Sequence, residues 1–248
     1  HSLGQRLIYV PLLLGATLVF LQRFTPKKWQ SLVYKHRVTF VICVSSHLYA
    51  LKACLLDDPK QISSLKTIVT SSAPIDAHFK KELINTIGCD FHEIYGTTEI
   101  AVATNLSPKD SKTKFTTVGL ALDQIKLKIL DESKYEVAIN TIGEIAVQTP
   151  LAFEGYYGLP ELSEEAHHND FFLTGDLGFV DEDNFLSYVG RKKDVIISGG
   201  SNIYPKDIET ALSQYPDLDE ISVIGLDDGL LGEVIIAICV SKTKENIE

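Results

Sequence analysis

The stretch GRKKDVIISGGSNIYPKDIE, from Gly190 to Glu209, is the most informative part of this chain. It opens with a charged cluster, continues as a short β-branched run that predicts a strand, and then places two adjacent glycines before Pro205. Because proline is favoured at the first position of a helix, residues 207–214 predict one amphipathic helix. The charged cluster predicts a hinge between two modules; a solvated linker would also explain the charges, but not the paired glycines.

Upstream of this stretch, residues 1–112 alternate between apolar runs and helical patterns. The runs at 38–44 and 67–70 predict short buried strands, and 77–87 carries helical spacing of its apolar residues. Strands that alternate with helices predict an α/β layer with a largely parallel sheet.

The following region, residues 113–190, alternates in strand fashion at 125–130 and 143–148 and has weak helical signals. It predicts a β-rich subdomain, a distorted barrel. The expected organisation is therefore α/β overall, with a large domain over 1–190 and a hinge with an incomplete C-terminal α+β domain over 191–248.

The apolar run from Leu7 to Leu21 is about 15 residues long and is interrupted by Pro11 and Gly15. A membrane helix needs about 20 apolar residues. We therefore expect a buried strand and the start of a helix here, with peripheral membrane contact as the alternative.

Composition limits the classes of function. The chain has 248 residues, 45% of them hydrophobic, and a net charge of −10, so it can bury a core and repels nucleic-acid backbones. A nucleotide site would need local donors, a metal and a few basic side chains. The four cysteines are far apart without zinc spacing, and we expect buried free thiols in a reducing cytoplasm.

Three further segments carry polar groups in turns. Ser71-Ser72-Ala73-Pro74 follows an apolar strand and would let the backbone approach a flat ligand, although taken alone the segment is better explained as a strand-to-helix turn capped by serine. Tyr95-Gly96-Thr97-Thr98-Glu99 combines an aromatic ring, two hydroxyls and a carboxylate, which suits a nucleotide with Mg²⁺; the alternative is a turn that caps the next helix. In Thr174-Gly175-Asp176-Leu177-Gly178, one carboxylate can accept from both ribose hydroxyls, or the segment is a tight turn between strands.

Taken in order along the chain, these segments resemble the adenylate-forming superfamily: acyl-CoA synthetases, adenylation domains of peptide synthetases and firefly luciferase. GEIAVQTP at 143–150 and Gly155-Tyr156-Tyr157 match as well. The resemblance runs from His1 to about Gly232.

The resemblance implies a binding site for ATP or AMP. Glu99 would coordinate the Mg²⁺ of MgATP, Thr98 would contact the α-phosphate, and Gly96 and Thr97 would complete that turn. Asp176 would bind the ribose with Arg191 beside it. The adenine side would be lined by two strand ends: Ser72, Ala73, Pro74, Glu93, Ile94 and Tyr95.

It also implies a moving C-terminal domain. Lys193 matches the pivot between two half-reactions, and Gly199 and Gly200 match the loop that approaches the acyl group and the pantetheine arm. His1 matches a histidine near the carboxylate pocket. The family's phosphate-cradling loop and its C-terminal catalytic lysine would fall outside the sequence, so we expect a fragment that is inactive in adenylation by itself.

The activity implied is that of an ATP-dependent acid–thiol ligase that forms an acyl-adenylate and then a thioester with coenzyme A. The segment SGGSNIYPKDIE favours a CoA ligase. The resemblance is to fatty-acid or aryl acyl-CoA ligases, and the residues of the chain do not identify the acid. The alternatives are a carrier protein as the acceptor of an amino or fatty acid, and a non-catalytic nucleotide-binding relative.

Overall fold

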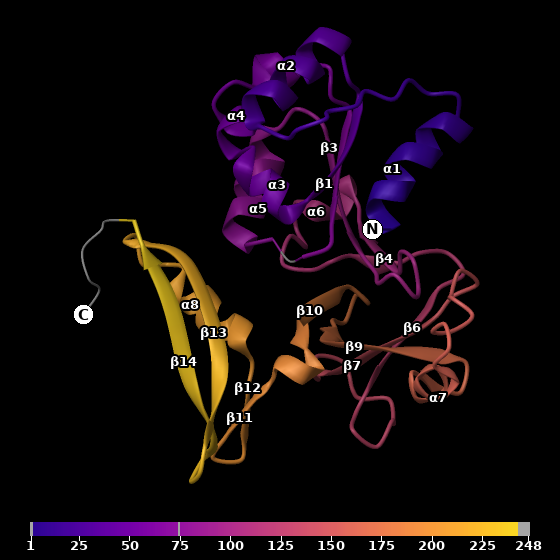
Figure 1. Ribbon diagram of the computed structural model, residues 1–248, viewed down its shortest axis with the longest axis vertical. Helices are drawn as coiled ribbons and strands as arrows, with labels where there is room; N and C mark the ends of the chain where they lie inside the picture. Colours follow the sequence, from indigo (N-terminus) through magenta and orange to yellow (C-terminus); the bar gives the residue numbers. More distant parts are fainter. Residues whose placement is uncertain (1, 74, 243–248) are drawn as a thin grey trace. The chain divides into compact units, whose positions relative to one another are not determined.

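The computed structural model describes residues 2–73 and 75–242 (Figure 1). His1 and Pro74, both named above as candidate site residues, lie outside the described residues. By its internal contacts the chain forms two compact units. The first unit comprises His1–Lys126, Gln148–Pro160 and Asn184–Leu186, and the second comprises Leu127–Val147, Glu161–Asp183 and Ser187–Glu248. The predicted domain boundaries at 112 and 190 stay predictions.

The first unit is built on a five-stranded sheet in the order β1-β2-β3-β4-β5. β1, β2 and β3 are parallel, whereas β4 and β5 are antiparallel to their neighbours. The predicted strands at 38–44 and 67–70 are confirmed as β1 and β2. The bounds are β1 Phe40–Val44, β2 Thr67–Ser71, β3 Asp90–Tyr95, β4 Thr104–Leu106 and β5 Leu120–Ala121.

Helices α2 to α5 lie together on one side of this sheet (Figure 1). Their buried residues, such as Val33, Leu48, Leu55 and Leu83, form one apolar core with Ile68 and Phe91 of the sheet. The helix expected at 77–87 is confirmed as α5. The helical bounds of the first unit are α1 Ser2–Leu13, α2 Pro26–His36, α3 Ser45–Ala50, α4 Lys52–Leu56, η1 Pro59–Ile62, α5 Ala77–Thr86 and α6 Pro108–Ser111.

The prediction of a buried strand within Leu7–Leu21 is wrong. The first part of that run is helix α1, and its apolar side chains are open to solvent: Tyr9 is 62% exposed and Leu13 is 85% exposed. An apolar run shows that burial would be favourable, but it does not specify which element will cover it. Among the described helices, none is both long and apolar enough to cross a bilayer.

Most of a second sheet, in the order β10-β9-β7-β6, lies in the second unit. Within it β7 and β9 are antiparallel, and β8 adds by antiparallel pairing with β9. This is the β-rich region expected from the sequence. The elements are β6 Lys126–Leu130, β7 Gly143–Gln148, α7 Pro160–Glu165, β8 His167–His168, β9 Phe171–Val180 and β10 Leu186–Arg191.

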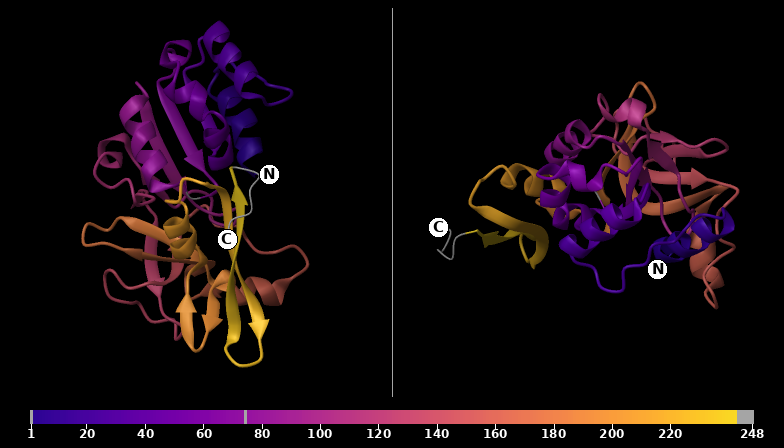
Figure 2. Two further views of the ribbon diagram at one scale, coloured as in Figure 1. Left: turned by 90° about the vertical axis from the view of Figure 1, so that its left-hand side faces the viewer. Right: turned by 90° about the horizontal axis from the view of Figure 1, so that it is seen from above.

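The same unit ends in an α+β module, as predicted. Its sheet has the order β12-β11-β14-β13, and β13 and β14 form a long antiparallel ribbon (Figures 1 and 2). Gly199 and Gly200, with φ of 57° and 80°, form the two-residue turn of a hairpin that Ser198 and Ser201 close. The bounds are η2 Lys192–Asp194, β11 Ile196–Ser198, β12 Ser201–Ile203, α8 Pro205–Leu212, β13 Leu218–Asp228 and β14 Gly232–Ser241.

Candidate nucleotide-binding site

The candidate residues are divided between the two units. The segments after β2 and β3 belong to the first unit, whereas Asp176, Arg191, Lys193 and the glycine turn belong to the second. The convergence of Glu99 and Asp176 on one nucleotide therefore stays a prediction, and each half of the site is described by itself.

The segment after β2 is exposed and has an unusual backbone. Ser72 and Ala73 are exposed, and Ser72 has a φ of 83°, a left-handed conformation that is uncommon for a residue with a side chain. The serines do not cap the next helix, because Asp76 is the N-cap of α5 and accepts from the amide of Phe79 at 2.8 Å. Such strain after a parallel strand is typical of a functional turn.

The segment after β3 contains the candidate phosphate and metal groups. Tyr95 is buried at the end of β3, Thr98 is exposed and Glu99 is half-buried. A turn rather than a helix follows, so Glu99 is not the N-terminal residue of a helix. The hydroxyl oxygen of Thr97 is buried and has no hydrogen-bond partner among the described residues, which leaves a polar group for a ligand to satisfy.

Gly96 is required by the close return of the chain on itself. A Cβ atom at this position would lie 1.9 Å from the carbonyl oxygen of Ala101. Ala101 itself has a φ of 59°. The tight backbone path therefore brings the threonines and Glu99 together in a short space.

Glu99 is held by the segment that follows β7. The hydroxyl of Tyr156 donates to Oε1 of Glu99 at 3.1 Å, and the amide of Phe153 donates to the Glu99 carbonyl at 2.7 Å. The rings of Phe153 and Tyr156 meet edge to face, with centroids 4.8 Å apart. Tyr156 belongs to the Gly155-Tyr156-Tyr157 segment that matches the family, but no role was predicted for it.

Glu93 is committed to a buried ion pair. Its carboxylate contacts the ammonium group of Lys80 on α5, and each side chain is 4% exposed. Lys80 also donates to the carbonyl of Thr117 at 3.2 Å. Burial raises the pKa of Glu93, and the charge of Lys80 opposes that rise. A role of Glu93 at the adenine would therefore have to use its backbone. The pairing of Glu93 with Lys80 was not predicted from the sequence.

In the second unit, Asp176 lies in an irregularity inside β9 rather than in a turn between strands. The register of β9 against β7 shifts between Glu144 and Ala146, which pair with Leu177 and Leu173. The extra residues of β9 form a bulge in which Gly175 has a φ of 68°. The hydroxyl of Thr174 fixes the bulge, because it donates to the Ile145 carbonyl at 2.7 Å and accepts from the Asp176 amide at 3.1 Å.

The carboxylate of Asp176 is 6% exposed and contacts a guanidinium nitrogen of Arg191 at 2.6 Å. Arg191 also donates to the Thr174 carbonyl at 3.3 Å. Burial raises the pKa of Tyr188 to about 12, and the negative charge of Asp176 adds to that rise. The bulge thus presents a buried carboxylate that is paired with a guanidinium group.

Glu144 joins this bulge to the predicted hinge. Its Oε1 accepts from the Gly175 amide at 3.1 Å, and its Oε2 accepts from the ammonium group of Lys192 at 2.7 Å. Lys193 follows in η2 and is exposed. Glu144 lies within GEIAVQTP, a motif that matches the family, but nothing in the sequence indicated these two contacts.

A magnesium ion would have to take part of its coordination from the nucleotide. Within residues 2–73 and 75–242, no three His, Cys, Asp or Glu side chains gather to hold a metal. Mg²⁺ is commonly bound by one or two carboxylates together with substrate phosphates. A half-buried Glu99 beside exposed Thr98 fits that donor set.

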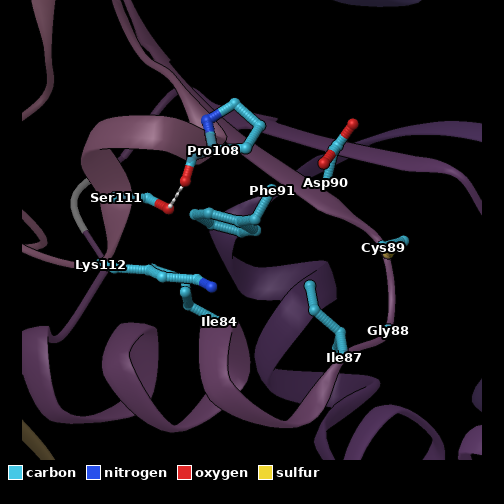
Figure 3. Close-up of a pocket in the computed structure, with 9 residues that line it drawn as sticks. All are labelled: Ile84, Ile87, Gly88, Cys89, Asp90, Phe91, Pro108, Ser111 and Lys112. Atoms are coloured by element: carbon cyan, nitrogen blue, oxygen red, sulfur yellow. Dashed lines mark hydrogen bonds between the residues drawn. The ribbon is translucent and has the colours of Figure 1, made fainter.

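A pocket of about 290 Å³ lies elsewhere, at the amino-terminal end of β3 (Figure 3). The candidate residues follow the opposite, carboxyl-terminal end of that strand. The pocket is lined by Ile84, Ile87, Gly88, Cys89, Asp90, Phe91, Pro108, Ser111 and Lys112.

Comparison with known proteins gives a consistent result. A family model described as AMP-binding enzyme matches residues 1–157. The indoleacetate–CoA ligase of Aromatoleum aromaticum is 32% identical over 227 residues, which cover 91% of this chain and 44% of the ligase.

Solved structures of the o-succinylbenzoate–CoA synthetase MenE from Bacillus subtilis superpose on 99% of this chain and on 50% of their own, at 28% identity. The TM-score is 0.89 for the complex with the acyl-adenylate intermediate and 0.87 for the complex with ATP and magnesium. The chain spans about half the length of the curated relatives that it matches.

Proposed function

Because this chain belongs to the AMP-binding enzyme family, we propose that it is part of an ATP-dependent acid–thiol ligase, an acyl-CoA synthetase. The reaction would join a carboxylic acid to AMP and then transfer the acyl group to coenzyme A. The observation that carries the proposal is the buried carboxylate of Asp176, held in a strand bulge against Arg191. A carboxylate only accepts hydrogen bonds, so it suits the two donors of a ribose.

The first unit would supply the base and phosphate contacts. Ser72, Ala73 and the backbone of Glu93–Tyr95 would face the adenine, and Gly96 would let the backbone approach. The Thr97 hydroxyl, which is buried without a partner among the described residues, and the Thr98 hydroxyl would donate to phosphate oxygens.

Glu99 would hold Mg²⁺, which when bound supplies positive charge next to the phosphates. The acid's carboxylate oxygen would attack the α-phosphorus, and pyrophosphate would leave with its electron pair. The thiol would then attack the acyl carbon and release AMP. Neither step needs a side-chain nucleophile, so the residues of this chain would act by binding and orienting the reactants.

We place the pivot between these two steps at Lys193, and the Gly199–Gly200 hairpin turn would approach the pantetheine arm in the second step. Coenzyme A is the preferred acceptor because the relatives include named CoA ligases. A carrier protein is the competing acceptor, and the acyl-adenylate intermediate would be the same for both acceptors. The four cysteines are free thiols, although Cys239 is exposed rather than buried as expected. Free thiols fit a reducing compartment such as the cytoplasm. Any membrane contact would be peripheral.

The test has two stages. Calorimetry of AMP binding, with Asp176→Ala as the variant, examines the nucleotide site; we expect the variant to lose most of its affinity. With the full-length protein, acid-dependent ATP–pyrophosphate exchange over a panel of aryl and fatty acids examines the chemistry. Mass spectrometry of the product with coenzyme A or a carrier protein then identifies the acceptor. Wild-type protein that binds no AMP and exchanges no pyrophosphate with any acid would refute the proposal.

A further inference from the structure

We propose that Tyr156 is a positioning residue for the metal site: its hydroxyl orients the carboxylate of Glu99 toward Mg²⁺. The inference rests on the proposed function, because it names a residue that supports the same site. The phenolic oxygen of Tyr156 lies 3.1 Å from Oε1 of Glu99, within hydrogen-bond distance.

The contact joins two segments that are far apart in sequence. Glu99 follows β3, whereas Tyr156 lies between β7 and α7, and both belong to the first unit. The backbone of Phe153 holds the same glutamate from the main-chain side, at 2.7 Å. The Phe153 ring packs against the Tyr156 ring edge to face, at an interplanar angle of 71°. Tyr156 is therefore itself held in place. A residue can orient another side chain only if its own position is fixed.

The chemistry of the contact suits a metal ligand. A glutamate side chain has three rotatable bonds, so an unheld carboxylate samples many positions. A hydrogen bond from a phenol to one oxygen fixes the plane of the carboxylate, and a carboxylate has about four lone-pair sites, so capacity for a metal remains. Partners of this kind commonly change metal affinity by about 10–100-fold when they are removed.

The neighbouring residue offers a matched control. Tyr157 is 103% exposed, whereas Tyr156 is half-buried. Tyr156→Phe removes the hydroxyl and keeps the ring against Phe153, and Tyr157→Phe removes the same atom from the same short segment.

The experiment uses the full-length protein and titrates Mn²⁺, observed by electron paramagnetic resonance, in the presence of ATP. Binding of AMP without metal is measured in parallel by calorimetry. We expect Tyr156→Phe to weaken Mn²⁺ binding by about 10–100-fold and to leave metal-free AMP binding within about twofold of the wild type. Tyr157→Phe should behave as the wild type in both measurements. In a Glu99→Ala background, Tyr156→Phe should have no further effect on Mn²⁺.

Three results would overturn the inference. Tyr156→Phe could bind Mn²⁺ as the wild type does, it could lose AMP and Mn²⁺ affinity equally, or it could weaken Mn²⁺ binding as strongly in the Glu99→Ala background. The second result would indicate a structural role only. If the wild type binds AMP but takes up no Mn²⁺ with ATP, the metal role of Glu99 fails as well; if it does not bind the nucleotide at all, the proposed function fails.

Discussion

Replacement of Lys80 by methionine should destabilise the protein strongly, because it leaves the carboxylate of Glu93 buried without a cation. Both side chains are 4% exposed, so water cannot take the place of the lost ammonium group. Removal of one partner of a buried ion pair costs about 3–5 kcal/mol. A typical domain has a total unfolding free energy of only about 5–15 kcal/mol. Lys80→Met should therefore lose about a fifth or more of the stability.

The paired replacement separates charge from packing. Lys80→Met with Glu93→Leu removes both charges and keeps similar volumes, and such exchanges are often neutral or stabilising by about 1–4 kcal/mol. One hydrogen bond is also lost, since Lys80 donates to the Thr117 carbonyl at 3.2 Å, at a cost of about 1 kcal/mol. We therefore expect the double variant to lie within about 2 kcal/mol of the wild type.

The deficit of Lys80→Met should also depend on pH. Burial raises the pKa of Glu93, and the charge and hydrogen bond of Lys80 are the effects that lower it. Without Lys80 the folded-state pKa of Glu93 rises further above its unfolded value. The folded state then binds the proton more tightly, so stability is retained at acid pH and falls as pH rises through the folded pKa.

The assay is urea unfolding at pH 5 and pH 8 of the wild type, Lys80→Met and the double variant. Lys52→Met is the control. Lys52 begins α4 and pairs at 3.1 Å with Glu82, which lies in α5 as Lys80 does, but the Lys52 side chain is 51% exposed. Loss of this exposed pair should cost about 0–1 kcal/mol. The reasoning fails if Lys80→Met costs no more than Lys52→Met, or if the double variant loses as much as Lys80→Met.

Three further outcomes follow from the geometry. Gly96→Ala should lower the unfolding free energy by about 2–3 kcal/mol in urea, because the added Cβ would lie 1.9 Å from the Ala101 carbonyl oxygen; unchanged stability would contradict the tight turn. Exposed Cys239 should react quickly with a disulfide reagent at pH 8, whereas Cys43, whose pKa burial raises to about 12, should react only on unfolding. Glu144→Ala should weaken AMP binding about five- to tenfold, because the Gly175 amide loses its acceptor. Glu144→Gln keeps an acceptor oxygen and should retain most of the affinity. Equal affinities of the two variants would argue against a role of Glu144 in supporting the bulge.

The features that sequence predicted best are local ones. The strand expected before the Gly199–Gly200 pair is β11. The hairpin turn that the pair forms with β12 was not predicted, although two successive positive φ values cost little for glycine. Pro205 begins α8 for an equally local reason. In such cases a few adjacent residues determine the backbone, so the pattern alone contains the information.

Features that depend on a distant partner were missed. For Thr174–Asp176, a turn between strands was one of the two interpretations, and neither was a bulge. The bulge could not be predicted locally because it depends on the register of β9 against β7. Lys80 has an exposed lysine, Lys81, beside it, and nothing local distinguishes the two. Only the packing of α5 against β3 brings the Lys80 ammonium group to Glu93.

The predicted hinge shows how local and distant information combine. The residue types alone do not distinguish the charges at Arg191, Lys192 and Lys193, whereas the resemblance gave roles to Arg191 and Lys193 only; the structure adds their partners. Arg191 is paired with Asp176 at 2.6 Å and Lys192 with Glu144 at 2.7 Å, so both are anchored to the β7–β9 sheet. Lys193 follows these two residues and, like them, is exposed. We propose that a rotation of the C-terminal module would begin at Lys193, because a pivot one or two residues earlier would have to break an ion pair next to the bulge that holds Asp176.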